Sequence, residues 1–123
     1  MFLTSSKMTS YLYEWVIIEE SLIDNRILNN LNIVELEITT EENPEDRWHI
    51  YTVLMSKDEI LNLAKYLKPS KFYAHFWSGN DMIAVFSGKT FEFYLDDRNS
   101  WKDAIEYGLS IDIPEEQLDF SID

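Results

Sequence analysis

Alternating and continuous runs of hydrophobic residues predict six strands along the chain. In the segment 11–18 apolar and aromatic residues lie on both sides, which is typical of an interior strand. Val34, Leu36 and Ile38 alternate with two glutamates, so this strand is expected to bury one face and to expose the other to solvent. Similar runs predict four more strands, the last three as a meander with tight turns: 48–55, 72–77, 82–86 and 90–95.

Three segments carry the spacing and the capping residues of helices. Apolar residues recur every three or four positions within 22–31, which predicts a short helix. Ser56 followed three residues later by Glu59 is a capping box, and it predicts a helix that runs to about Leu67. A third helix precedes Gly108, which is expected to form a left-handed cap.

The predicted order of elements is β-α-β-β-α-β-β-β-α, and its first six elements follow the ferredoxin-like split βαβ arrangement. In that arrangement helices lie on one face of an antiparallel sheet, and here the last three elements extend it. The fold class predicted is therefore α+β, mainly antiparallel sheet with helices packed on one face. The apolar phase of each element predicts these core residues: Trp15, Ile17, Leu36, Ile60, Leu63, Phe76, Val85, Phe93 and Ile105.

Length and composition are those of a single globular domain. The chain has 123 residues, of which 46% are hydrophobic, and we assign one domain to 11–123. Residues 1–10 are expected to form a flexible leader, because they lack the apolar core of a signal peptide. There is no cysteine, which excludes disulfides and thiolate metal sites, and no apolar run long enough for a membrane span. We expect a cytoplasmic protein.

The charge balance narrows the classes of partner. With 23 acidic and 10 basic residues the net charge is −13, so the surface repels nucleic acids and anionic membranes. Residues 81–123 carry three basic and eleven acidic side chains, which is −8 of that total. This acidic surface either serves solubility or docks a basic protein. The carboxylates in turns, Asp96 and Asp97 among them, also hydrogen-bond nearby backbone. The sequence predicts no oligomeric state.

Catalytic signatures such as phosphate-binding loops, nucleophile elbows and zinc motifs are absent. The two histidines lie in separate predicted strands, and a compatible register would bring them to one open face. Two imidazoles and a carboxylate could bind zinc or exchange protons there, although no local spacing enforces their convergence. We therefore predict no metal and no cofactor, with packing the alternative role of the aromatic rings. The residues of this candidate face are His49, Tyr51, Tyr73, His75, Trp77, Glu92 and Tyr94.

Two segments of the chain carry a resemblance to known sequences. They are His75-Phe-Trp-Ser-Gly-Asn-Asp-Met-Ile-Ala-Val-Phe-Ser-Gly-Lys89 and the run from Trp101 to Phe120. Together they resemble a family of small, uncharacterised prokaryotic proteins with no assigned activity. The resemblance implies a small cytoplasmic domain and transfers no catalytic residue.

These observations leave two hypotheses from different classes. The first is a non-enzymatic interaction or regulatory protein, of the immunity or inhibitor kind, that docks a basic partner. It uses the aromatic and acidic residues of the candidate face together with Asp96 and Asp97. The second is a small hydrolase or ligand-binding enzyme that uses His49 and His75. The two differ in whether the imidazoles converge beside a carboxylate.

Overall fold

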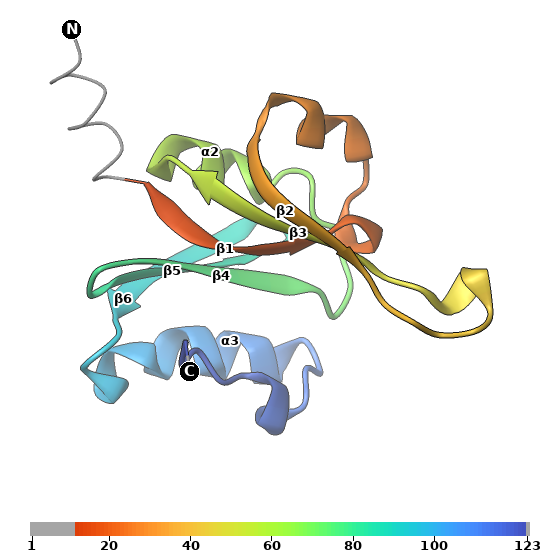
Figure 1. Ribbon diagram of the computed structural model, residues 1–123. Helices are drawn as coiled ribbons and strands as arrows, with labels where there is room; N and C mark the ends of the chain where they lie inside the picture. The colour runs from red at the N-terminus through yellow and green to blue at the C-terminus, as the bar shows by residue number, and fades with distance from the viewer. Residues whose placement is uncertain (1–11, 123) are drawn as a thin grey trace, which may run out of the picture.

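A computed structural model describes residues 12–122, which fold around one six-stranded antiparallel sheet (Figure 1). The strands follow the order β2-β3-β1-β4-β5-β6 across the sheet. Their bounds are Tyr13–Ile18 (β1), Asn32–Ile38 (β2), His49–Met55 (β3), Tyr73–Ser78 (β4), Asp81–Phe86 (β5) and Lys89–Tyr94 (β6). The predicted α+β class is confirmed. The expected leader 1–10 lies outside the described residues.

The first four strands have the ferredoxin-like arrangement that the element order predicts. β1 pairs antiparallel with both β3 and β4, and β2 pairs with β3 at the edge. β5 and β6 extend this unit as two successive hairpins after β4. Two α-helices, α2 (Lys57–Leu63) and α3 (Lys102–Ser110), accompany the sheet, together with several short 3-10 turns.

The helices cover both faces of the sheet, so the expectation of helices on one face is wrong for α3. Figure 1 shows α2 above the sheet and α3 below it. Strand β5 lies between two cores: Ile83 and Val85 belong to the cluster that contains Ile60 of α2. Met82 and its even-numbered neighbours on β5 belong to the second cluster, which lies between the sheet and α3. The first six predicted elements keep the one-sided arrangement, and the added helix closes the second face.

The predicted helix at 22–31 forms instead two 3-10 segments, Glu19–Ser21 (η1) and Asn25–Asn30 (η2). Asp24 caps η2 by accepting a hydrogen bond from the Arg26 backbone N–H at 3.0 Å. Asparagine is a poor α-helix former because its side chain competes for backbone hydrogen bonds. Leu22 and Leu67 also form an isolated bridge, which holds the segment extended just before η2.

The capping box of α2 is confirmed, whereas the expected ends of α2 and α3 need correction. Ser56 Oγ accepts the Glu59 backbone N–H at 3.2 Å, and the Glu59 carboxylate accepts the Ser56 N–H at 2.9 Å. α2 ends four residues before Leu67 and continues as a turn. α3 continues through Gly108, so Gly108 is not the expected left-handed cap; the residue in the left-handed conformation after the helix is Asp112, at φ 68°. The missing side chain of Gly108 instead leaves space for Leu118.

The edge strand β2 departs most clearly from the pattern predicted for the core. All seven of its residues are exposed, and Leu36, expected in the core, is 48% exposed. On the α2 side η2 lies beside the start of the strand, where its residues line a hollow together with Ile33, and β2 stays exposed along its whole length. The other predicted core residues are buried, except that Trp15 and Ile105 are half-buried beside the clusters.

No helix among residues 12–122 has the length and apolar composition of a membrane span.

Candidate functional site

A hollow lies where the ladder between the two central strands, β1 and β4, is interrupted. β1 and β4 share a single pair of opposed residues, Glu14 and Trp77. Beyond that pair the two strands form no further ladder, although each keeps its full pairing with β3 or β5. The hollow is therefore a consequence of the strand arrangement in the middle of the sheet.

A cleft of about 510 Å³ occupies this position on the face that carries α3. Val16 and Ile18 of β1 and Ile50 of β3 line it with aliphatic side chains. Ile18 and Ile50 are directly opposed in the β1–β3 ladder, so they form one continuous apolar surface. Lys71 and Gln117 also line the cleft, and with Ser21 and Thr39 they add polar groups to it.

Aromatic rings form the walls of this cleft. Trp48, which is 39% exposed, meets Phe72 edge to face at a centroid distance of 6.2 Å. Thr39 positions Trp48, since its hydroxyl accepts the Trp48 backbone N–H at 2.8 Å and its own N–H donates to the Trp48 carbonyl at 3.0 Å. On the inner side Trp15 stacks on the ring of His75 at 5.3 Å. Such walls suit a ligand that presents an apolar or aromatic group.

Like Ser21, His75 is a buried polar residue of the cleft. Its side chain packs between Trp15, Tyr73 and Phe120, and the residue is 8% exposed. Nε2 has no hydrogen-bond partner among the described residues. Burial lowers the pKa of the imidazole to about 4, against the opposing charge of Asp119. His75 is therefore neutral near pH 7 and acts as an aromatic wall.

Tyr73 ties the C-terminal segment to the sheet. Its hydroxyl donates a hydrogen bond to the Gln117 carbonyl in the 3-10 turn Glu115–Gln117 (η5). Burial, together with the nearby charge of Asp119, raises the pKa of the phenol to about 12. The phenol stays protonated and the contact persists over the physiological pH range. Tyr73 thus fixes one wall of the cleft.

Searches with the chain against protein-family models, curated proteins and solved structures find no match. The function is therefore inferred from the geometry of the molecule itself.

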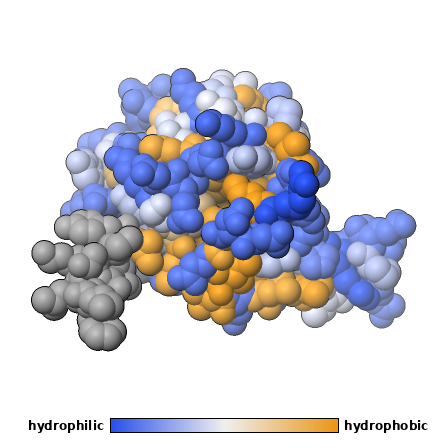
Figure 2. Space-filling model, turned by 90° about the horizontal axis from the view of Figure 1, so that it is seen from above, coloured by the Kyte–Doolittle hydropathy of each residue, from blue (hydrophilic) through white to orange (hydrophobic). Residues whose placement is uncertain are grey.

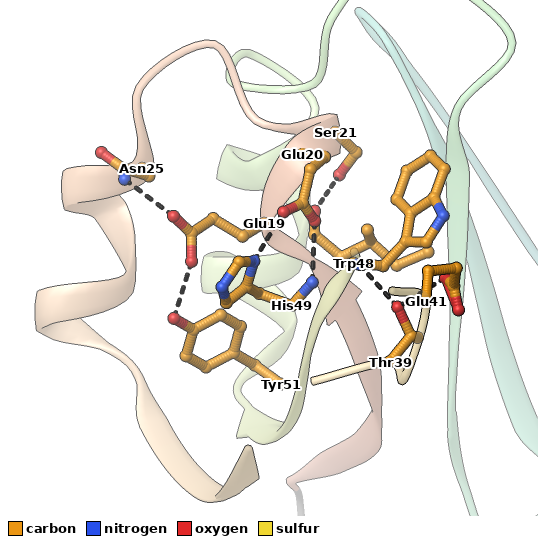
Figure 3. Close-up of polar contacts among 10 residues, drawn as sticks. Glu19, Glu20, Ser21, Asn25, Thr39, Glu41, Trp48, His49 and Tyr51 are labelled. Carbon is orange, nitrogen blue, oxygen red and sulfur yellow. Dashed lines mark hydrogen bonds and ion pairs between the residues drawn. The ribbon is translucent and has the colours of Figure 1, made fainter. Parts of the chain in front are cut away.

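The second polar cluster surrounds His49 at the start of β3, and Figure 3 shows its contacts. Glu20 accepts a hydrogen bond from the His49 backbone N–H at 2.9 Å and lies 2.7 Å from Nδ1 of the ring. Burial by itself would raise the pKa of the Glu20 carboxyl, but the hydrogen bonds from His49 hold it below its usual value. The pair fastens η1 to β3.

Tyr51 extends this cluster toward η2. Its hydroxyl donates to Glu19 at 2.7 Å, and the other oxygen of Glu19 accepts from the Asn25 amide at 3.0 Å (Figure 3). The hydrogen bond to Glu19 raises the pKa of the Tyr51 phenol. Every one of these groups has a structural partner. The cluster therefore explains how the irregular segment 19–30 is held in place.

The structure separates the residues that the sequence suggested for one open face. The α2 side carries Tyr51, which pairs with Ile17 on β1 and packs against the first core. The α3 side carries Trp77, which packs against the second core. Trp77 pairs with Glu14 of β1, and Glu14 and Ile17 point to opposite faces because side chains alternate along the strand. The two histidines follow their strands, so His49 and His75 point to opposite faces. The register that would bring both histidines to one open face therefore does not occur.

The remaining predicted site residues lie around β6 and the turn after it. Glu92 forms an ion pair with Lys57 at 2.9 Å. Tyr94 is 53% exposed and lies on the same side of the sheet as Glu92, which is the α2 side. Asp96 accepts a hydrogen bond from the Asn80 amide at 3.0 Å. Asp97 caps the 3-10 turn Arg98–Trp101 (η4) by accepting the N–H of residue 99. These carboxylates have local structural roles, and they are separate from the cleft.

Sequence reasoning missed the residues of the cleft that lie outside the predicted face. Trp48 and Phe72 stand at the first positions of two predicted strands, and Lys71 immediately precedes the second. Large aromatic rings at strand ends, beside a polar turn, were the available signal. Their meeting depends on β1 lying between β3 and β4, which no local pattern encodes.

No group of three or more histidine or carboxylate side chains that could hold a metal occurs within residues 12–122. The cleft has apolar floor residues, aromatic walls and a single exposed cation in Lys71. Two carboxylates lie beside residues that line it: Asp119 near His75, and Glu41, which accepts a hydrogen bond from the Thr39 hydroxyl at 2.8 Å. This chemistry suits binding by burial of apolar groups rather than acid–base catalysis.

Proposed function

We propose that the chain is a non-enzymatic protein-binding domain, regulatory in the manner of an immunity or inhibitor protein, that docks a basic partner. The observation that carries the proposal is the aromatic cleft on the half of the sheet that α3 leaves uncovered. Binding sites at protein interfaces commonly combine buried aromatic anchors with a polar or charged rim. The cleft supplies the first feature, and the charge of the chain supplies the second.

Several acidic side chains lie on β2 and on the hairpin that follows it. Glu35 opposes Thr52, and Glu37 opposes Ile50, so both glutamates share a face with the cleft floor. The tip of the β2–β3 hairpin adds four exposed carboxylates around the 3-10 turn Pro44–Asp46 (η3). Figure 2 shows this tip as a hydrophilic lobe that projects from the body. A basic partner would be attracted to this side of the molecule.

The enzyme hypothesis required His49 and His75 to converge on a carboxylate. His49 is held by Glu20 on one side of the sheet, and His75 is buried on the other. The pair on which a hydrolase mechanism depended is therefore absent, and no other observation favours that hypothesis.

The test uses the immobilised full-length chain, a cell lysate, and identification of the bound proteins by mass spectrometry. Trp48→Ala removes an exposed wall of the cleft, and Leu109→Ala, at a 42% exposed site on α3, is the matched control. We expect a basic protein that the wild type and the control retain and the cleft variant loses. Retention should weaken as salt rises, because the Debye length shortens to about 8 Å at physiological ionic strength.

A circular dichroism melt establishes that Trp48→Ala still folds. Proteins that bind the wild type and the folded cleft variant equally would overturn the proposal. So would a set of bound proteins that is acidic or indifferent to salt.

A further inference from the structure

We propose that β2 is the docking edge for an extended segment of the partner in which apolar and basic residues alternate. The segment would add to the sheet as a seventh strand. This inference rests on the proposed protein-binding function and specifies the chemistry of the partner.

β2 is an open edge of the sheet. It pairs with β3 on one side only, and no described strand lies on its outer side. An edge strand presents backbone N–H and C=O groups that an incoming strand can satisfy. At the opposite edge of the sheet the apolar residues of β6 are covered, because Phe91 and Phe93 pack against the core beneath α3. β2 has no such cover.

The side chains of β2 are unusual for an edge that meets only water. Ile33, Val34, Leu36 and Ile38 are between 39% and 60% exposed. Figure 2 shows hydrophobic surface reaching the border of the molecule next to the hydrophilic lobe. Three of these side chains, Ile33, Leu36 and Ile38, form an aliphatic strip on this seven-residue strand, and an added strand would place its own side chains beside them.

The register with β3 sorts these side chains onto two faces. Leu36 opposes Tyr51 and Ile38 opposes His49, which places the aliphatic strip on the α2 side. Ile33 lies on that side too, because the extra residue Val34 forms a bulge that shifts the phase by one.

Glu35 and Glu37 lie on the other face, one strand away from the cleft floor. Since side chains alternate along a strand, an added strand would place every second residue beside the aliphatic strip. The residues in between would lie beside the two glutamates. The complementary segment therefore alternates branched apolar residues with lysine or arginine.

A second copy of this chain is a poor occupant of the same edge. In an antiparallel pair of β2 strands centred on Leu36, Glu35 of each copy would face Glu37 of the other. Like charges directly opposite each other destabilise a strand pair. The acidic hairpin tips and a charge of −13 on each chain add to the repulsion. The bulge and the glutamates thus oppose self-association, while they leave the edge open to a basic strand.

The test measures binding of a fluorescent peptide with four Val-Lys repeats to the full-length chain by anisotropy. The variant Glu35→Lys/Glu37→Lys reverses the charge at the edge. The variant Asp103→Lys/Glu106→Lys makes the same change in net charge on α3, where both residues are exposed. Each cross-strand pair contributes roughly 0.2–1 kcal/mol, so we expect the edge variant to lose about tenfold or more in affinity and the control to lose much less.

A second peptide, N-methylated at every residue, lacks the backbone donors of both strand edges. It should bind far more weakly than the parent peptide, because strand addition requires main-chain hydrogen bonds. Equal binding of the two peptides would overturn strand addition. Equal loss in the edge variant and the α3 control, or no binding to the wild type, would overturn β2 as the docking edge.

Two further outcomes separate this inference from the proposed function. If the partner captured from lysate is lost by Trp48→Ala but kept by the folded edge variant, β2 is not its docking edge, and the protein-binding function stands. If the chain sediments as a dimer that Leu36→Lys dissociates, the edge belongs to a second copy and the inference fails.

Discussion

Replacing the buried His75 with phenylalanine is expected to flatten the pH dependence of folding on the acid side of neutrality. Burial lowers the pKa of the imidazole from 6.5 to about 4, and Asp119 opposes that shift only in part. The unfolded chain therefore binds a proton at pH values where the folded chain does not. The stability that neutral His75 confers is present above pH 6.5 and is lost as the pH falls toward 4.

The magnitude follows from the difference between the two pKa values. One pKa unit corresponds to about 1.4 kcal/mol. As the pH falls from about 7 to about 5, the free energy of unfolding should therefore decrease by about 2 kcal/mol because of His75. By about pH 4 the loss should reach about 3 kcal/mol. Phenylalanine keeps a ring against Trp15 and Phe120 and has no proton to gain. It also removes Nε2, a buried nitrogen without a partner.

Urea unfolding at several pH values between about 4 and 7 measures this effect as the difference between variant and wild type. Carboxylates titrate in the same range in both proteins, so their contribution cancels in the difference. His49→Gln is a comparison variant that leaves the buried imidazole in place; because it also removes the hydrogen bond of the His49 ring to Glu20, any change in its pH dependence is assigned to that pair. If His75→Phe and wild type lose stability in parallel over this range, burial does not depress the pKa of His75.

Three substitutions test the packing and capping of the fold by urea unfolding at neutral pH. Phe76→Ala empties a fully buried site and should cost about 3–5 kcal/mol; a loss below about 0.5 kcal/mol would contradict the packing of β4. Ser56→Ala removes the cap of α2 and should cost about 1 kcal/mol, whereas Ser110→Ala, near the end of α3, should cost much less. Gly108→Ala places a Cβ 2.5 Å from Leu118 Cδ2. The overpacking should cost about 1–3 kcal/mol, more than the gain in helix propensity, so the variant should be less stable than the wild type. A stabilised variant would show that Leu118 moves away freely.

The sequence predicted the elements that depend on local chemistry. The capping box at Ser56, the alternation of strands and the two hairpins after β4 all follow from neighbouring residues, and they are confirmed. The ferredoxin-like order of the first four strands is also confirmed. Each of these features needs only short-range patterns or a common topology.

The failures have a common cause in long-range pairing. Whether His49 and His75 share a face depends on the register of each strand with β1, which separates β3 from β4. A register shift of one residue moves every side chain of a strand to the other face of the sheet. The ladders place Tyr51 opposite Ile17 and Trp77 opposite Glu14, and these two residues of β1 point to opposite faces. No local pattern encodes that parity.

The alternation at Leu36 led to an incorrect prediction for a different reason. The pattern of β2 is amphipathic, as for a strand with one buried face, yet the strand stands at the sheet edge without a covering helix. The pattern records which residues could be buried, whereas burial itself depends on what packs above them. An amphipathic edge strand without cover is consistent with a face completed by a partner.

The open half of the sheet follows from the dimensions of the elements. An α-helix is about 10 Å wide, and neighbouring strands are about 4.8 Å apart, so one helix covers about two strands of a sheet. Figure 1 shows α3 beneath the sheet, and the cluster that it covers includes residues of β5 and β6. The C-terminal segment extends that cover to Tyr73 of β4. Ile18 and Ile50 lie beyond that cover, so within residues 12–122 the interruption between β1 and β4 stays open as a cleft on the α3 side.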